Sequence, residues 1–422
     1  MKRSPGRFDA DPYPGRPKVL FVGPAFSSHC QSWIELLGAA RLNVRFFSLP
    51  GLPPPGWKVR SYLTGVPPRR LDPACVRALY PAGRAGWAVR AVARQLLGKD
   101  LGHELAWLAR IVRRWRPDVV HTFALNGPGL LWLRALEQRR IAAPPRWVLQ
   151  LWGGSDVEAI RHDLRDRPEP ARALRRCDSL LADNRPALDL ARELGTPADR
   201  IPDFAPVPGT GGIDLEAARA AASEPPSARR LALMPKAYES RWSKALPVIE
   251  GIRQAWRDIQ PCRIVMLAAN DEVRSAVAAL PGEIAERIEV HARISRDAAL
   301  ELMSRARVML APSLVDGTPN TMLEAMAAGA LPVVSPLDAI RAAAGDGDGV
   351  LWARNLWPEE IAAALTKAMT DDGLVERCAE ANRTRVRQLA DRASIAPRVI
   401  ALYERLAAGL PRSASAGAAA AP

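Results

Sequence analysis

The stretch Ala311–Ser335 decides the fold of this chain and reads A-P-S-L-V-D-G-T-P-N-T-M-L-E-A-M-A-A-G-A-L-P-V-V-S. Apolar residues over 307–311 predict a short buried strand, and Asp316-Gly317 predicts a tight turn after it. A helix and a second buried strand over 331–334 are expected to follow. Strands that alternate with helices in this way are typical of a parallel α/β sheet.

The helix of this stretch is expected to begin at Thr318 and Pro319. Thr318 is a favourable N-cap, and Pro319 suits the first helical position, where the N–H that proline lacks has no partner in any case. Gly329 is expected to end the helix. The start of such a helix collects unpaired N–H groups and the positive end of the helix dipole, so it predicts a site for an anion such as a phosphate.

Two carboxylates flank this helix start. Asp316 lies in the turn, and Glu324 follows it by eight residues within the helix. Both are placed to accept hydrogen bonds from hydroxyl groups on either side of a bound diphosphate. The alternative is an ordinary capped helix whose acids are only solvated.

The composition is that of a soluble globular protein. The 422 residues suffice for two domains with separate cores, and 48% of them are hydrophobic and 25% charged. No apolar run approaches the roughly 18 residues of a membrane-spanning helix, and the N-terminus lacks a signal-peptide core, so we expect a cytoplasmic protein. The five cysteines show neither zinc nor disulfide spacing, and Gly345–Gly349 lacks the further ligands of a calcium loop, so no metal site is expected.

The positive charge is concentrated at the start of the chain. Residues 1–116 hold 20 Lys or Arg against 6 Asp or Glu, which accounts for the whole net charge of +14. Two basic amphipathic helices are expected, near 89–96 and over 101–116. They are either packed helices with solvated arginines or, together with Trp87, a face that meets an anionic membrane surface; an acidic glycan or nucleic acid would also suit this charge.

The residues around Glu324 carry a specific resemblance. A carboxylate, seven further residues and a Glu within L-E-A-M-A-A-G resemble the signature of retaining glycosyltransferases of family four, the glycosyl transferases group one. The resemblance implies a GT-B fold of the α/β class, with two Rossmann-like doubly wound domains facing a cleft. It implies that a sugar passes from a nucleoside diphosphate sugar to a hydroxyl acceptor without metal or cofactor, in polysaccharide or glycolipid assembly.

In the family, the second acid contacts the donor ribose, the first contacts the transferred sugar, and the helix start carries the diphosphate. Asp316 stands where Glu is commoner. Basic residues after the strand over 230–234 neutralise the diphosphate, and Lys244 matches them best. The implied donor-binding residues are Lys236, Arg241, Lys244, Arg293, Ile294, Asp316, Gly317, Thr318, Pro319, Asn320, Thr321, Met322, Leu323 and Glu324, of which Asp316 and Lys244 are also expected to be catalytic.

The N-terminal half resembles the family less closely. A strand over 18–22, a helix near 31–40 and a strand over 43–48 predict its opening, without the G-x-G-x-x-G of dinucleotide enzymes. His121, at the end of P-D-V-V-H, is a candidate catalytic residue. The candidate acceptor or cleft residues are Ser27, Ser28 and His29 after the first strand and Ser155 and Asp156 in a Gly-Gly-Ser-Asp loop; a buried polar loop is the alternative for Asp156, and a plain helix start is the alternative for His29.

The resulting domain organisation has six parts. They are a flexible lead-in over 1–16, an N-terminal acceptor domain over 17–205, a hinge over 206–229, a nucleotide-sugar domain over 230–394, a helix over 395–410 that crosses back to the N-terminal domain, and a disordered tail over 411–422. Two other functions stay open. One is a nucleotide-sugar epimerase or hydrolase of the same fold, and the other is a non-catalytic protein that binds nucleic acid or a membrane through its basic face.

Overall fold

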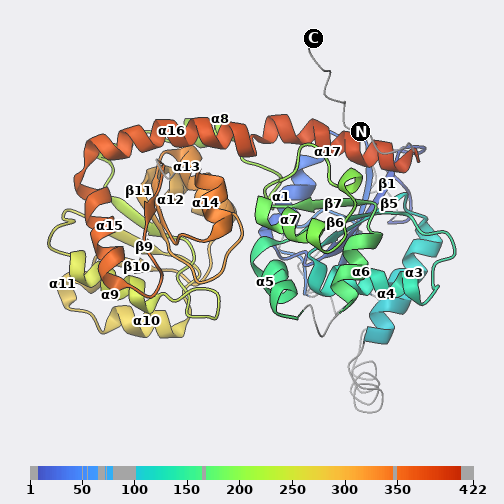
Figure 1. Ribbon diagram of the computed structural model, residues 1–422, viewed down its shortest axis with the longest axis horizontal. Coiled ribbons are helices and arrows are strands. Elements are labelled where there is room, and N and C mark those ends of the chain that lie inside the picture. Colours follow the sequence, from blue (N-terminus) through green and yellow to red (C-terminus); the bar gives the residue numbers. More distant parts are fainter. Residues whose placement is uncertain are drawn as a thin grey trace, which may run out of the picture. The chain divides into compact units, whose positions relative to one another are not determined.

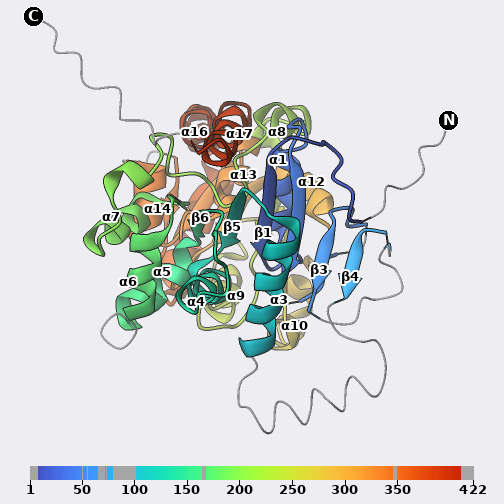
Figure 2. The same cartoon turned by 90° about the vertical axis from the view of Figure 1, so that its right-hand side faces the viewer.

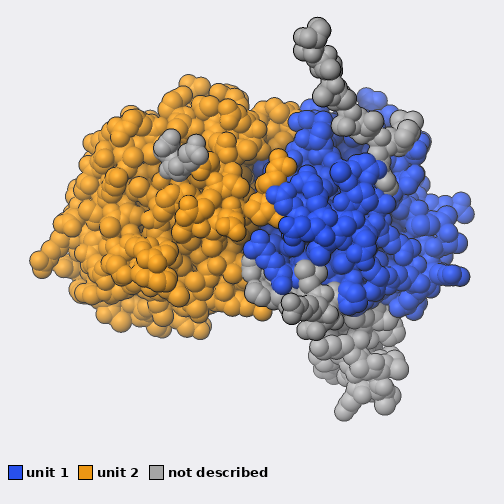
Figure 3. Space-filling model, viewed as in Figure 1, with its two compact units in different colours: residues 1–183, 187–210, 396–422 blue, residues 184–186, 211–395 orange. Residues whose placement is uncertain are grey.

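The computed structural model divides into two compact units, which are described separately (Figure 3). The N-terminal unit comprises residues 1–183, 187–210 and 396–422, and the C-terminal unit comprises residues 184–186 and 211–395. The predicted hinge over 206–229 is thus divided between the two units: residues up to 210 belong to the N-terminal unit, and residues from 211 belong to the C-terminal unit. The structure describes residues 8–49, 51–54, 56–64, 72, 74–78, 101–163, 168–345 and 349–409.

The N-terminal unit is built on a parallel sheet of seven strands in the order β4-β3-β2-β1-β5-β6-β7, with β3 and β4 at one edge (Figure 2). The strands are β1 (Lys18–Gly23), β2 (Asn43–Ser48), β3 (Ser61–Leu63), β4 (Val76–Ala78), β5 (Val119–Phe123), β6 (Arg146–Leu151) and β7 (Ser179–Ala182). The helices are α1 (Ser28–Leu36), α3 (Leu101–Trp115), the π-helical turn η1 (Leu125–Gly129), α4 (Leu130–Glu137), α5 (Gly153–Asp163), α6 (Pro168–Arg176), α7 (Arg185–Glu193) and the short η2 (Ala198–Arg200).

Successive side chains of these strands point to opposite faces of the sheet, so they pack into two different cores. One face, with Leu20 and Val120, packs against α3, α4, α6 and α7. The other face carries aromatic rings, among which Phe21 and Phe123 have their centroids 5.4 Å apart. This aromatic face meets Trp33 of α1 and Tyr403 of α17 (Arg392–Ala407).

The C-terminal unit is built on a parallel sheet of six strands in the order β10-β9-β8-β11-β12-β13. The strands are β8 (Leu231–Met234), β9 (Arg263–Met266), β10 (Ile288–Val290), β11 (Ala306–Ala311), β12 (Leu331–Val334) and β13 (Leu351–Trp352). The helices are α8 (Leu215–Ala220), η3 (Pro226–Ala228), α9 (Leu246–Ala255), α10 (Asp271–Ala278), α11 (Gly282–Ala285), α12 (Arg296–Arg305), α13 (Asn320–Ala328), α14 (Asp338–Ala344), α15 (Pro358–Thr370) and α16 (Asp372–Ala390).

Helices cover both faces of this second sheet (Figure 1). Within the C-terminal unit, α9, α10 and α15 contribute to the core on one face, and α12, α13 and α14 contribute to the core on the other. Two parallel sheets with helices on both faces confirm the predicted pair of Rossmann-like, doubly wound domains.

Each sheet reverses its strand order once. In the N-terminal unit the chain builds outward from β1 to β4 and then returns to add β5 on the other side of β1. In the C-terminal unit the same reversal lies between β8 and β11. Ligands of open α/β sheets bind beyond the carboxyl ends of the strands at such a reversal, so the loops after β1, β5, β8 and β11 are the places to look for a site.

The helix of the deciding stretch ends as predicted. Gly329 follows α13 with φ +84°, a left-handed conformation that favours glycine. A Cβ there would lie 2.9 Å from a guanidinium nitrogen of Arg383 and 3.0 Å from Cγ of Pro226. The backbone conformation therefore favours glycine here, and the nearby Pro226 leaves little room for a Cβ.

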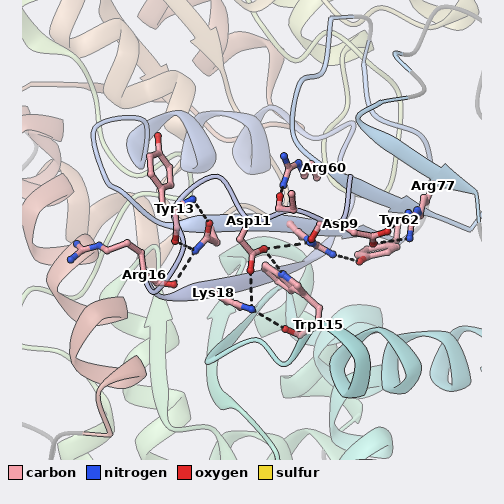
Figure 4. Close-up of polar contacts among 12 residues, drawn as sticks. Asp9, Asp11, Tyr13, Arg16, Lys18, Arg60, Tyr62, Arg77 and Trp115 are labelled. Atoms are coloured by element: carbon pink, nitrogen blue, oxygen red, sulfur yellow. Dashed lines mark hydrogen bonds and ion pairs between the residues drawn. The ribbon is translucent and has the colours of Figure 1, made fainter. Parts of the chain in front are cut away.

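The first residues of the chain differ from the prediction. Residues 8–16, expected to form part of a flexible lead-in, pack against the N-terminal sheet: Phe8 is buried, and the Tyr13 N–H donates to Oδ1 of Asn43 (2.9 Å). Figure 4 shows Asp11 accepting a hydrogen bond from the Trp115 indole (2.8 Å) and pairing with Lys18 (2.8 Å). Specific charge pairs therefore hold a segment whose Pro and Gly content suggested disorder.

A buried arginine lies at the centre of this arrangement. Arg45 of β2 is 3% exposed, donates to Tyr62 Oη (2.7 Å) and to the Asp9 carbonyl (2.9 Å), and stands 4.5 Å from the Trp115 ring centroid. A buried cation needs such partners because desolvation of an unpaired charge is costly. Residues 8–16 supply part of them.

The basic helices are described only in part. In α3, the predicted apolar stripe is buried at Leu105, Leu108, Val112 and Trp115, while Arg110, Arg113, Arg114 and Arg116 are exposed. The stretch near 89–96, Trp87 and the tail over 411–422 lie outside the described residues. Within the described part of the chain, no helix combines the length and the apolar character needed to cross a membrane.

Candidate functional site

The loops that follow β8 and β11 are joined to each other by hydrogen bonds. The Trp242 carbonyl accepts the N–H groups of Leu314 (2.9 Å) and Val315 (3.1 Å). The Ser243 hydroxyl donates to the Pro312 carbonyl (3.3 Å). Since β8 and β11 are neighbours at the reversal of strand order, these two loops form one surface beyond their carboxyl ends.

Asn355 holds the two loops together from the buried side of this surface. No role for this residue was predicted from the sequence. Its side chain is almost fully buried and donates to the carbonyls of Pro312 (2.8 Å) and Lys244 (3.0 Å), while its Oδ1 accepts the Lys244 N–H (3.0 Å). The backbone of Lys244 is therefore held in place although its amine remains accessible. Nothing in the local sequence around Asn355 indicates this role, because both partners are distant in the chain.

The three predicted cations have different surroundings. Lys236 forms an ion pair with Asp316, and both side chains are partly buried. The Lys244 Nζ lies 3.4 Å from Oε2 of Glu239, an acid that we did not predict at the site. The exposed Arg241 lies over the Trp242 ring, 4.3 Å from its centroid. The structure therefore brings Lys236 to Asp316, whereas Arg241 is held by an aromatic contact at the rim.

Helix α13 begins one residue later than predicted. Pro319 is the N-cap, with φ −66° and ψ 123°, and it offers no side-chain cap to the first turn. Thr318 was expected in that role, but its hydroxyl donates to the Ala339 carbonyl (3.4 Å) instead. The helix start therefore lacks a side-chain cap, as a site that receives an anion requires.

Two of the residues predicted to bind through the helix start are not available to a ligand. The N–H groups of Met322 and Leu323 donate to the Pro319 carbonyl (3.0 and 3.3 Å), and their side chains are buried in the core. This contradicts their predicted ligand contacts. Thr321 differs, because its buried hydroxyl has no hydrogen-bond partner among the described residues. The Gly317 N–H donates to Oδ1 of Asp316 (3.1 Å), and Asn320 is buried beside them.

Glu324 lies on the fifth position of α13 in a largely buried environment. Its side chain is 12% exposed, and its Oε1 is 3.3 Å from a guanidinium nitrogen of Arg296. Burial raises the pKa of Glu324, and the nearby Arg296 opposes that rise. Arg293 and Ile294 precede α12; Arg293 is exposed and Ile294 packs partly against the core.

The predicted residues of the N-terminal unit lie at its own reversal of strand order, after β1. Ser27 caps α1, and its hydroxyl accepts the His29 N–H (3.3 Å). Ser28 is exposed at the first position of α1, which begins earlier than expected. The His29 ring stands edge-on to the Trp152 ring with centroids 5.3 Å apart. Of these residues, Ser28 is exposed, and Ser27 and His29 are half-buried.

His121 is in the core, which contradicts its predicted catalytic role. The side chain is fully buried, and its Nδ1 is 2.6 Å from Oη of Tyr403, which also accepts a hydrogen bond from the Trp33 indole (2.8 Å). Burial lowers the pKa of His121 to about 3, so the ring is neutral at physiological pH. A histidine without an exposed face has no route to a substrate, and this one joins β5 to α17.

Asp156 is a structural residue as well. It lies in the first turn of α5, not in a loop, and its carboxylate accepts the N–H groups of Leu125 (2.8 Å), Asn126 (3.0 Å) and Trp152 (3.0 Å). The side chain is fully buried and cannot face an acceptor. Instead, its hydrogen bonds to Leu125 and Asn126 hold the backbone of the segment that follows β5. Ser155 lies in the same turn of α5, and its side chain is outside the described residues.

The burial of Asp156 has a consequence for stability against pH. Burial raises the pKa of Asp156 to about 6, although its hydrogen bonds oppose the rise. Since the folded pKa exceeds the unfolded value, the stability that Asp156 contributes is complete below about pH 4 and is lost as pH rises through 6. We expect Asp156→Asn to cost about 2 kcal/mol more at pH 4 than at pH 7.

Urea unfolding of both proteins at the two pH values measures this difference. Asp203→Asn is the matched control, because the Asp203 side chain is 83% exposed. An equal cost at both pH values, or a larger cost at pH 7, would contradict the raised pKa.

Comparison with known proteins finds a family match for part of the C-terminal unit. Residues 241–371, which include Asp316, α13 and Glu324, match the family model described as Glycosyl transferases group 1. The segment is thus similar to the group 1 glycosyltransferases. The resemblance drawn from the acids and the helix is thereby confirmed for this glycosyltransferase segment. No curated protein matches the sequence as a relative.

Solved structures extend the likeness to the fold of the whole chain. The sucrose-phosphate synthase of Thermosynechococcus elongatus is 16% identical, with a TM-score of 0.65, over 93% of this chain and 100% of that one. Anabaena HepE, solved with UDP-glucose, is 13% identical, with a TM-score of 0.62, over 91% and 98%. A protein described as a UDP-N-acetylglucosamine 2-epimerase from Listeria monocytogenes is 12% identical, with a TM-score of 0.61, over 94% and 98%. At these identities the likeness shows the fold.

Proposed function

We propose that the protein is a retaining glycosyltransferase that moves a sugar from a nucleoside diphosphate sugar to a hydroxyl acceptor. The observation that carries the proposal is the surface beyond β8 and β11. There, the Lys236–Asp316 pair stands beside the uncapped start of α13. Asp316 and α13 lie within the segment that matches the group 1 glycosyltransferase model, and Lys236 lies just before it. Cations and a helix start suit a diphosphate, and carboxylates suit sugar hydroxyls.

In this proposal the donor lies along α13. Glu324 accepts hydrogen bonds from ribose hydroxyls, and Asp316 accepts them from the transferred sugar. The diphosphate lies against the helix start, where the unpartnered Thr321 hydroxyl can donate to a phosphate oxygen. Lys236 then exchanges part of its contact with Asp316 for the diphosphate. Arg293 and Ile294 face the nucleobase through main-chain groups.

The chemical step is the loss of the diphosphate from the anomeric carbon. The bond from that carbon to a diphosphate oxygen breaks, a bond to the acceptor oxygen forms on the same face, and the acceptor proton passes to the departing diphosphate. Fixed cations stabilise the charge that develops on the leaving group. Lys236 and Lys244 hold that role here, and the transfer is proposed to need no metal ion or other cofactor.

The acceptor is assigned to the N-terminal unit. Ser27, Ser28 and His29 lie beyond the carboxyl end of β1, where that sheet reverses its order. The exposed arginines of α3 support an anionic surface as a partner, either a membrane or an acidic glycan. We therefore place the enzyme in polysaccharide or glycolipid assembly, cytoplasmic and peripheral on the inner face of a membrane.

Binding of nucleoside diphosphates tests the proposal. UDP, GDP and ADP are each added to the full chain, followed by the glucose and N-acetylglucosamine conjugates of the nucleotide that binds. A ligand at a hundred times its Kd stabilises the native state by about 2.7 kcal/mol, which thermal unfolding detects. Inorganic pyrophosphate is the control for recognition of the nucleoside. The proposal fails if none of the nucleotides raises the melting temperature above the effect of pyrophosphate.

Product analysis separates transfer from the epimerase alternative. With a bound nucleotide sugar and no acceptor, an epimerase or hydrolase releases an altered or free sugar, whereas a transferase leaves the donor intact until an acceptor is added. Binding to duplex DNA that persists while no nucleotide binds would instead favour the nucleic-acid alternative.

A further inference from the structure

A cavity beside Glu324 contains a charge arrangement that the donor signature does not explain. It has a volume of about 510 Å³ and lies between α8, α12 and α13 of the C-terminal unit. Its walls are mainly apolar, with Ala217, Leu300 and Met303 among them. Its polar end holds Glu324 and Arg296, whose nearest charged atoms are 3.3 Å apart.

We propose that Arg296 is a positioning residue of the donor site, which holds the Glu324 carboxylate in the orientation that accepts hydrogen bonds from ribose hydroxyls. The proposal rests on the proposed function and adds a residue to it. Arg296 contacts Oε1 of Glu324, which leaves Oε2 for a ligand. The arginine itself lies at the first position of α12, two residues after the loop assigned to the nucleobase.

The charges around the cavity make this arginine decisive. The acids that line it are Asp214 at the N-cap of α8, Asp297 and Glu301 of α12, and Glu324 of α13. Arg296 is the one cation among the described residues that line it. On another side of α13, α16 presents Glu380, Arg383 and Arg387 beside Ala327. Without Arg296, every charged residue that lines the cavity beside Glu324 would be an acid.

Burial already favours the protonated form of Glu324, and Arg296 opposes that tendency. Removal of Arg296 therefore extends protonation of Glu324 to higher pH. A protonated carboxyl donates one hydrogen bond and loses acceptor capacity, so it grips a pair of ribose hydroxyls less well. As the pH is lowered, the affinity for the nucleotide should therefore begin to fall at a higher pH in the variant than in the wild type.

The test uses the full chain and whichever of UDP, GDP and ADP binds it most tightly. We expect Arg296→Gln to weaken binding about tenfold at pH 7, and the acid limb of the affinity profile to move to higher pH. Arg296→Lys should recover most of the affinity and the wild-type profile, since it keeps the charge. Arg253→Gln is the control, because Arg253 lies on α9 of the same unit in an exposed ion pair with Glu250.

A double substitution shows whether the two residues act together. If Arg296 works through Glu324, adding Arg296→Gln to Glu324→Gln should weaken binding less than twofold further, whereas independent action would repeat the full tenfold loss. That repeated loss, or an unshifted pH profile in Arg296→Gln, overturns the inference while nucleotide binding by the wild type leaves the proposed function standing. Absence of nucleotide binding in the wild type overturns the proposed function itself.

Discussion

Glu324→Ala is expected to lower the affinity for the nucleoside diphosphate about a hundredfold, since two hydrogen bonds to a charged group together contribute about 3 kcal/mol. The carboxylate is 12% exposed and carries the hydrogen bonds to both ribose hydroxyls in the proposed complex. The substitution also leaves Arg296 beside an empty volume without its acid. Titration calorimetry with the nucleotide that binds the wild type measures the loss.

The control for this substitution is Glu250→Ala on α9. Glu250 is also paired with an arginine, Arg253 at 2.7 Å, but it lies on an exposed helix surface. It should leave affinity unchanged. Thermal unfolding of both variants shows whether each is folded. A folded Glu324→Ala protein with wild-type affinity would remove Glu324 from the donor site.

Lys236→Ala and Lys244→Ala are each expected to lower kcat about a hundredfold, because each removes one fixed positive charge from the departing diphosphate. KM should change less, since the charge on that group is greatest in the transition state. Lys236 is paired with Asp316, and Asn355 holds the backbone of Lys244, whose amine lies 3.4 Å from Glu239. Initial rates with a saturating donor measure the effect.

The matched control for the lysines is Arg253→Ala, which removes an exposed cation of the same unit. Lys244→Arg should retain part of the activity, because the charge stays while its geometry changes. Unchanged kcat in both lysine variants would move leaving-group stabilisation to other residues. A loss in one variant alone would identify which cation faces the diphosphate.

The C-terminal unit could be predicted well because its signals are local. Strand, turn, helix and Gly329 follow one another within a short stretch, and each is specified by its own neighbours. The acids of that stretch were found in the same way. What could not be predicted is the partner of each acid: Lys236 is 80 residues from Asp316, and Arg296 is 28 residues from Glu324.

The wrong predictions for His121 and Asp156 share one physical cause. His121 follows a strand end, as catalytic residues often do, but Tyr403 from a helix 282 residues later covers it. Asp156 sits in a polar, glycine-rich segment, yet three main-chain N–H groups draw its carboxylate inward. In both cases, contacts with residues distant in the chain decide whether a polar side chain faces solvent. The local sequence pattern does not predict those contacts.

Two three-residue strands, β3 and β4, were also missed. They lie in a region rich in Pro and Gly, where the sequence shows no strand pattern. They exist because β2 offers a parallel edge to β3, and β3 in turn offers one to β4. Strands as short as these have little propensity to form on their own, so their structure depends on the sheet that they join.

The embedded guanidinium of Arg45 also sets a limit for protein engineering. A version of the chain trimmed to start at Lys18 would strip that group of the Asp9 carbonyl and the Asp11 carboxylate, and would take away the Phe8 ring that shields it. Purification tags therefore belong ahead of Phe8, so that the partners of Arg45 stay in the chain.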